Sequence, residues 1–229
     1  MTTSGTYNYS PAASDLVLAA YSRIGVRGAA LTTQHLQDAY TEANLQLVEW
    51  SNKQPNLWTE ELQSTPIIGG TATYVLGQET IALLIVYVTI GTGTSAQDRT
   101  LGPVSGTDYA SFPNKAQTGV PNAFWFNRTI TPSITLWPTP DSTQTYTLKW
   151  RRVRQVQDTS IKGGATLETP YRWFDAFTCG LTYRLARMYA PERAMMLKAD
   201  AVEAWNVAAY EDQEDVSISI MPELAEYFR

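Results

Sequence analysis

The feature that most constrains the fold is the spacing of apolar residues, which is strand-like in the middle of the chain and helical at both ends. Residues 57–156 are rich in β-branched residues, Gly and Pro. Within them, the apolar run 81–90 predicts a strand that is buried on both faces or at a subunit contact. Runs 134–137 and 145–150 predict two more strands joined by a Pro-containing loop. Residues 98–123 predict long surface loops with short strands.

Apolar residues in the N-terminal part recur at steps of three and four, as in amphipathic helices. Ser14 is a suitable N-cap for a first helix, and Gly25 ends it. A second helix is predicted to begin near Thr32 or Thr33, and residues 52–56 close it. The apolar positions of this second helix are Leu36, Ala39, Tyr40, Ala43, Leu47 and Trp50.

Two further helices are predicted after the β-type region. Thr169 caps the first of them, and Pro170 takes its first helical position. Pro191 starts a new helix, because a proline does not continue the previous one. This last helix, residues 192–210, is rich in alanine, and small residues let helices approach closely. The apolar face of the earlier helix consists of Trp173, Phe174, Phe177, Leu181, Leu185 and Met188.

These patterns predict an α+β fold. About four helices from both chain ends form an antiparallel bundle, with a β-sheet module inserted between them and an extended C-terminal tail. The corresponding segments are 1–56 for the N-terminal helices, 57–168 for the β module, 169–210 for the C-terminal helices and 211–229 for the tail.

The composition argues against several classes of function. Charged residues make up 17% of the chain, aromatic residues 11%, and the net charge is −5, which suits a protein covered by partners better than a nucleic-acid binder. With one cysteine, Cys179, and one histidine, His35, we expect no disulfide, catalytic residue, metal or cofactor. The N-terminus lacks signal-peptide features, and the apolar run 81–88 is too short to cross a bilayer. We therefore expect a soluble intracellular product.

Two acidic clusters are candidates for catalytic chemistry. Glu60 and Glu61, beside Trp58, allow glycoside hydrolysis if one carboxyl has a raised pKa. Neighbouring residues on a strand point to opposite faces, which favours a solvated or interface role instead. Residues 211–215 form the second cluster and begin the C-terminal tail.

The chain has one basic cluster, made of Lys149, Arg151, Arg152 and Arg154. On a strand, Lys149 and Arg151 share one face, and the other two side chains share the opposite face. Nucleic-acid binding is one interpretation. Because the chain is net negative, we favour a polybasic sheet edge that prevents stray pairing, or an ion-paired subunit contact.

The C-terminal segment 211–229 combines an acidic start with an apolar, alternating end. A spacing of two suits a strand that is added to the sheet edge of another protein. This much apolar surface is unusual for a solvated tail, so we expect the segment to dock on another subunit or partner. Its apolar residues are Val216, Ile218, Ile220, Met221, Leu224, Tyr227 and Phe228.

Several motifs follow one another along residues 15–222. They are Arg23-Ile24-Gly25-Val26, Ala43-Asn44-Leu45 before Trp50, Gly119-Val120-Pro121 before Phe124-Trp125-Phe126 and Arg128, Ile134-Thr135-Leu136-Trp137-Pro138-Thr139-Pro140, Arg151-Arg152, Pro170-Tyr171-Arg172-Trp173 and Leu181-Thr182-Tyr183-Arg184-Leu185-Ala186. In this order they resemble the head-to-tail adaptor, or connector, proteins of short-tailed tailed bacteriophages, the packaged-DNA-stabilisation family.

The resemblance implies a structural virion protein at the head–tail junction, made and assembled in the host cytoplasm. Such adaptors form a dodecameric ring under the portal, continue the DNA channel, retain packaged DNA and carry the tail nozzle or tail fibre proteins. Their C-terminal segment inserts between portal subunits, and residues 211–229 match it. The inserted β module would face the neighbouring subunit or the tail. The candidate residues for that contact are Trp125, Arg128, Trp137, Arg151 and Arg152.

Ring formation and DNA passage also fit the composition. A ring needs head-to-tail contacts between two different faces of each subunit. An acidic wall repels phosphates, so duplex DNA passes without sequence-specific binding. We expect no membrane partner. The alternatives are another neck or tail component, such as a tail tube or nozzle protein, a cell-wall hydrolase, or an ordinary binding module.

Overall fold

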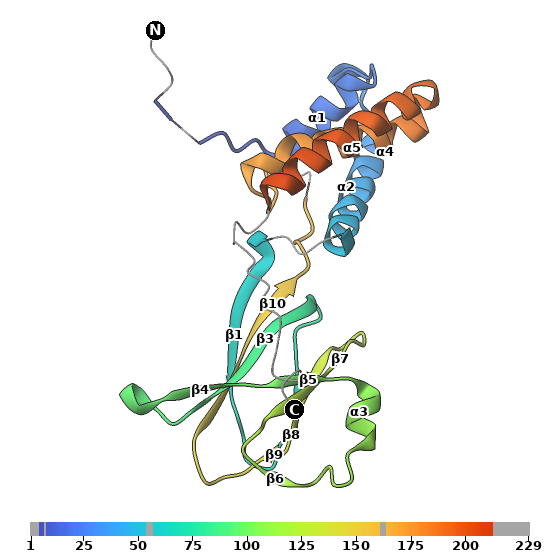
Figure 1. Ribbon diagram of the computed structural model, residues 1–229. Helices are drawn as coiled ribbons and strands as arrows, with labels where there is room; N and C mark the ends of the chain where they lie inside the picture. The colour runs from blue at the N-terminus through green and yellow to red at the C-terminus, as the bar shows by residue number, and fades with distance from the viewer. Residues whose placement is uncertain (1–4, 7, 54–56, 161–163, 213–229) are drawn as a thin grey trace, which may run out of the picture.

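The computed structural model describes residues 5–6, 8–53, 57–160 and 164–212, and it has a helical part above a β part (Figure 1). The α-helices within these residues are α1 (Ala13–Arg23), α2 (Thr33–Lys53), α3 (Gly106–Ser111), α4 (Phe174–Tyr189) and α5 (Ala194–Glu211). Short 3₁₀ turns are η1 (Gly28–Ala30), η2 (Leu57–Thr59), η3 (Gly93–Ser95), η4 (Tyr171–Trp173) and η5 (Pro191–Arg193). The predicted α+β class is confirmed. The antiparallel four-helix bundle and the segment boundaries stay predictions.

Helix α4 is the centre of the helical part, because α1, α2 and α5 each pack against it. Its predicted apolar face is buried except at its two ends, where Phe174 is partly buried and Met188 is 46% exposed. In the stripe of α2, Ala39, Ala43, Leu47 and Trp50 are buried, whereas Leu36 and Tyr40 are 44% and 38% exposed. The largest fully buried side chains of this core are Trp173, Tyr21, Phe177, Leu47, Leu181, Leu185 and Val17.

The helix ends follow the sequence signals in part. Gly25 ends α1 as predicted: its φ is +91°, and its N–H donates to the Ser22 carbonyl oxygen at 3.1 Å. Pro191 begins a new helical segment, also as predicted. The prediction that Ser14 caps α1 is wrong, because the helix already begins at Ala13. After Pro170, the chain first forms η4, and α4 begins only at Phe174.

The strands form two four-stranded sheets and one two-stranded sheet. The strands are β1 (Glu60–Pro66), β2 (Thr73–Val75), β3 (Thr80–Ile90), β4 (Gln97–Thr100), β5 (Gly102–Val104), β6 (Thr118–Gly119), β7 (Ala123–Asn127), β8 (Ser133–Trp137), β9 (Thr139–Pro140) and β10 (Tyr146–Arg154). The first sheet has the order β1-β10-β3-β4 and is antiparallel throughout. The second has the order β2-β8-β7-β5, with β5 parallel to β7. Strands β6 and β9 form a parallel pair.

The two larger sheets share one apolar core that is separate from the helical core. Val86, Leu148 and Trp150 come from the first sheet, and Phe124 and Leu136 come from the second. The prediction that the run 81–90 is buried on both faces within the chain is therefore wrong. One face of β3 is buried, whereas Leu84 and Ile85 are 47% and 44% exposed. Its alternative, a strand at a subunit contact, stays a prediction.

The predicted strands at 134–137 and 145–150 are present as β8 and β10, but they lie in different sheets. They are therefore not neighbours in one sheet. The connection between them contains β9, which pairs with β6. Residues 98–123 hold short strands between loops, as expected, and also the short helix α3, which the pattern did not predict. No helix of the described residues is long and apolar enough to cross a membrane.

The segment after β10 joins the sheet to the helices. Val156 belongs to the helical core, and its N–H donates to the Ser51 Oγ atom of α2 at 3.4 Å. Further along, the Thr159 N–H donates to Asn44 Oδ1 at 2.8 Å, and Asn44 Nδ2 donates back to the Thr159 carbonyl oxygen. These hydrogen bonds attach the segment that follows β10 to helix α2, at the junction between the two cores.

Candidate functional site

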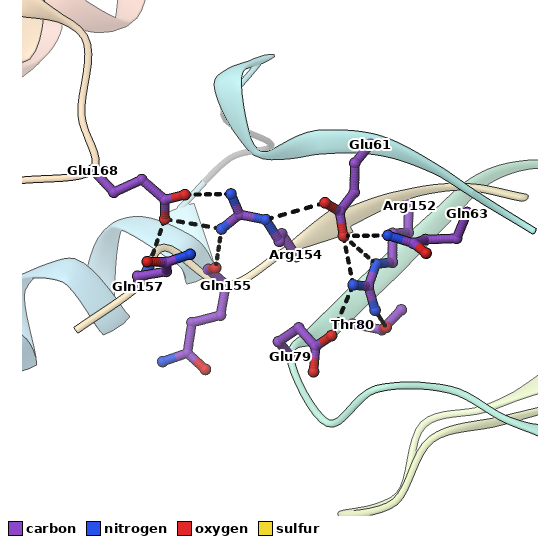
Figure 2. Close-up of polar contacts among 9 residues, drawn as sticks. All are labelled: Glu61, Gln63, Glu79, Thr80, Arg152, Arg154, Gln155, Gln157 and Glu168. Carbon is purple, nitrogen blue, oxygen red and sulfur yellow. Dashed lines mark hydrogen bonds and ion pairs between the residues drawn. The ribbon is translucent and has the colours of Figure 1, made fainter.

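A network of two arginines and three glutamates occupies the junction between the helical and β parts (Figure 2). Arg152 lies opposite Glu61 in the register of β10 and β1, and a bulge interrupts the pairing with β3 between Arg151 and Arg152. The Arg152 Nη2 atom donates to Glu61 Oε1 at 2.5 Å and to Glu79 Oε1 at 2.7 Å. Its Nη1 atom donates to Thr80 Oγ1 at 2.7 Å. One side chain therefore joins β1, β10 and the start of β3.

Arg154 extends this network toward the helices. It donates to both carboxylate oxygens of Glu168, and its Nε atom lies 3.5 Å from Glu61 Oε2. Glu168 also accepts the Gln157 N–H at 2.8 Å. In Figure 2, Glu61 lies between the two guanidinium groups, and Glu168 approaches Arg154 from the far side. The charges of the two arginines are thus matched by carboxylates of the same chain.

The carboxyl groups of the network have lowered pKa values. Burial alone raises the pKa of Glu61, but hydrogen bonds from Arg152 and Gln63 outweigh it. For Glu79, its own backbone N–H and the Arg152 guanidinium lower the pKa. For Glu168, the hydrogen bond from Arg154 is the main cause. The three carboxyl groups are therefore ionised at neutral pH, and their ion pairs with Arg152 and Arg154 hold the segments of the junction together.

This arrangement contradicts what a hydrolase would need from Glu60 and Glu61. A general acid requires a raised pKa, whereas the pKa of Glu61 is lowered. Glu60 pairs on the other face of the sheet with Arg151, whose Nη1 atom lies 3.8 Å from Glu60 Oε2. Within the described residues, no group of His, Cys, Asp and Glu side chains could hold a metal ion.

The face prediction for the basic cluster is confirmed, but the edge interpretation is wrong. Arg152 and Arg154 share the face with Glu61, and β10 lies between β1 and β3, so it is not a sheet edge. Arg151 is exposed on the opposite face. There Lys149 Nζ lies 5.8 Å from the ring centre of Tyr87. Exposed Leu62 and Ile85 flank Arg151 in the strand register, so this face is both cationic and apolar.

Two of the predicted contact residues, Trp125 and Trp137, form a platform for α3. The ring of Tyr109 stacks on Trp125 with centroids 5.3 Å apart, and the ring of Phe112 packs on Trp137 at 4.3 Å. Both tryptophans remain partly exposed. Gly106 permits this close approach, because a Cβ atom there would lie 3.2 Å from the Trp125 ring.

The other predicted contact residues differ in their accessibility. Arg128 is exposed in the loop after β7, and Arg151 is exposed on the sheet face. Arg152 is only 7% exposed, and its hydrogen bonds go to residues of its own chain. The structure does not bring these five residues into one patch, because Trp125 and Trp137 contact α3 whereas Arg152 lies at the junction. Their role in contacts with a subunit or the tail stays a prediction.

The predicted docking residues Val216, Ile218, Ile220, Met221, Leu224, Tyr227 and Phe228 lie outside the described residues. The start of this segment is described up to Asp212, whose side chain is fully buried. Asp212 pairs with Arg172 of η4 and accepts the Leu57 N–H at 3.3 Å. The chain therefore leaves the helical part from a fixed point.

Residue patterns gave no signal for a groove that α2, α4 and α5 form together. It has a volume of about 420 Å³, and its lining includes Trp50, Gly180 and Trp205, one from each helix. The lining residues come from three helices that are far apart in the sequence, so the spacing of residues within any one helix does not indicate a groove. The composition of α5 is a partial indication, because large apolar residues occur on its exposed side, among charged ones, as well as on the face toward α4.

The comparison with known proteins agrees with this architecture. A search of curated proteins found no match to the chain. The family model described as SU10 adaptor protein matches residues 12–221, which include the helical part, the β part and the start of the C-terminal segment. This span is nearly the stretch over which the motifs resemble phage head-to-tail adaptors. The chain thus belongs to the SU10 adaptor protein family and is a structural adaptor of phage virions.

Proposed function

We propose that this protein forms a ring beneath the portal, where it extends the DNA channel, retains the packaged DNA and provides the attachment platform for the tail. Membership in the adaptor family implies interactions with portal and tail components and a place in the virion. The dodecameric state and the passage of duplex DNA through the ring are part of the proposal. They derive from the resemblance to head-to-tail adaptors.

The observation that carries the proposal is the amount of large apolar side chain left exposed on the helical part. Large apolar side chains exposed together on a single chain usually mark a site that another protein covers. Helix α5 exposes several of them beside the charged residues Lys198, Asp200 and Glu203, which points to cover by other protein. The large apolar residues of α5 that are exposed are Met195 at 80%, Met196 at 60%, Val202 at 51%, Val207 at 62% and Tyr210 at 74%.

The sheet face around Arg151 is a second, chemically different surface. It combines exposed Leu62 and Ile85 with two cationic side chains, Lys149 and Arg151. A ring uses two different faces of each subunit, so the presence of two such surfaces supports a head-to-tail arrangement. In the proposed assembly, Arg151, Arg128 and the partly exposed Trp125 and Trp137 contact a neighbouring subunit or a tail protein.

The net charge supports a channel rather than a DNA clamp. The chain carries −5, and Arg152 and Arg154 are neutralised within the chain. Phosphate binding depends on uncompensated cationic side chains. We therefore propose that the ring guides DNA without sequence-specific binding.

The C-terminal segment 211–229 is the proposed portal-docking element. Its apolar residues alternate as in a strand added to another protein, and Asp212 fixes the point from which the segment departs. In the family that the chain resembles, the matching segment inserts between portal subunits. Ordering such a segment only on docking would make assembly sequential, because portal must be present first.

Removal of residues 216–229 tests the proposal. We expect the truncated protein to keep a folded subunit but to lose binding to purified portal rings of the same phage in co-sedimentation. A matched control keeps the length and replaces Ser217 and Ser219 by Thr, which preserves the alternation and is expected to bind normally. Unchanged affinity of the truncated protein for portal would overturn the docking role of the segment.

A further inference from the structure

The outer face of α5 forms a ridge of defined chemistry. Met196, Ala199, Glu203, Val207 and Tyr210 follow at steps of three or four residues and therefore share one side of the helix. All five are exposed. They are called the α5 ridge below. The ridge is apolar except for Glu203, and exposed Asp200 lies beside it on the same side of the helix. Neither carboxylate forms an ion pair within the described part of the chain.

The groove between α2, α4 and α5 is the complementary feature. Its lining includes Trp50 of α2, Ala176 and Gly180 of α4, and Ala201 and Trp205 of α5. A volume of about 420 Å³ leaves room for the side chains of one helix face.

The charges of the groove and the ridge are opposite. The groove is lined by the four cationic side chains of Lys53, Arg184, Arg187 and Lys198. Three of these cations form ion pairs with two carboxylates. Glu49 pairs with Lys53 and Arg184, and Glu42 pairs with Arg184 and Arg187. Lys198 has no ion-pair partner among the described residues. The groove therefore carries an excess of positive charge that the carboxylate of a ridge could balance.

We propose that the α5 ridge of one copy of this chain docks into the α2–α4–α5 groove of the next copy, with Glu203 near Lys198 of the neighbour. The two surfaces differ, so the contact is head-to-tail and leaves one ridge and one groove free at the ends of any chain of copies. This inference deepens the proposed ring function and rests on it, since it assigns the surfaces that join the subunits.

Two single variants of the full chain test the contact. Val207→Arg places a cation on the ridge and leaves the groove intact. Val202→Asp places a carboxylate at the groove, where Val202 contributes to the lining, and leaves the ridge intact. Both positions are more than half exposed, so neither variant disturbs the core. Leu18→Arg is the matched control, because Leu18 is a 42% exposed apolar residue on α1, outside both surfaces.

Sedimentation velocity over a concentration series measures self-association. The wild type and Leu18→Arg are expected to form species larger than dimers, and each test variant to associate at least about tenfold more weakly. An equal mixture of the two variants is expected to stop at dimers, because only one intact ridge faces one intact groove. Should the wild type associate only on portal rings, the number of copies bound per ring is the measure, and both variants are expected to reduce it.

Three results would overturn the inference: association of both variants as strong as that of the wild type, dimers formed by each variant alone, or equal copy numbers on portal rings. The second result indicates a symmetric contact through another surface. Binding of wild-type protein to portal rings is measured separately in the same series. If the wild type does not bind portal, the proposed function is contradicted. If it binds portal and both variants self-associate as strongly as the wild type, only the assigned interface is contradicted.

Discussion

Replacement of Arg152 by Met probes the junction between the two cores most directly. The Arg152 side chain is 8% exposed and its guanidinium group binds Glu61, Glu79 and Thr80, whereas a methionine side chain keeps the apolar stem and removes the charge. The replacement leaves two carboxylates of the same chain without their shared cation. We expect the free energy of unfolding to fall.

The magnitude follows from burial. Removing one partner of a fully buried ion pair costs about 3–5 kcal/mol. Here the Glu61 and Glu79 side chains are 32% and 45% exposed, so water partly replaces the lost cation. We therefore expect a loss of about 2–3 kcal/mol. For a chain of this size, that corresponds to a decrease in Tm of about 4–12 °C.

Thermal unfolding followed by circular dichroism and by tryptophan fluorescence measures the effect. Arg151→Met is the matched control, since Arg151 is the adjacent residue on the same strand, is 58% exposed and lies 3.8 Å from its only ion-pair partner in the described chain. That exposed pair is expected to contribute about 0–0.5 kcal/mol. Equal losses for the two variants would refute the reasoning that burial and shared carboxylates make Arg152 important.

The remaining predictions concern pH, one turn and one buried carboxylate. The pKa values of Glu61, Glu79 and Glu168 lie below their ordinary 4.5, so the stability that these carboxylates contribute is present above about pH 4.5 and is lost as the pH falls below it. Urea titrations at pH 7, 4 and 3 measure this loss of stability. The loss is expected to be smaller in Arg152→Met. Gly25→Ala places a Cβ atom at φ +91° and is expected to lower the free energy of unfolding by about 1 kcal/mol, measured by urea denaturation. Asp212→Asn removes the charge of a fully buried carboxylate, whose partner Arg172 is 30% exposed, and is expected to lower stability by about 1–3 kcal/mol; an unchanged urea midpoint would contradict this anchoring role.

The residue pattern alone predicts much of the helical part. The face of α4, the end of α1 at Gly25 and the restart at Pro191 are confirmed because helical periodicity and the backbone preferences of Gly and Pro act within a few residues. The alternation of side chains along a strand likewise predicted that Arg152 and Arg154 lie on one face. The family motifs added the adaptor assignment, which the match over residues 12–221 confirms.

Only the tertiary structure decided which groups those side chains meet. Arg152 finds Glu61 and Glu79, which are 91 and 73 residues away, and strands β8 and β10 enter different sheets. The groove of α2, α4 and α5 exists only because three helices from both chain ends converge. Periodicity is a local property of the backbone, whereas long-range pairing depends on how whole elements pack and on the closure of the loops between them. The sequence by itself therefore determined the elements and their faces, and the packing of distant elements determined the junction, the groove and the exposed ridge.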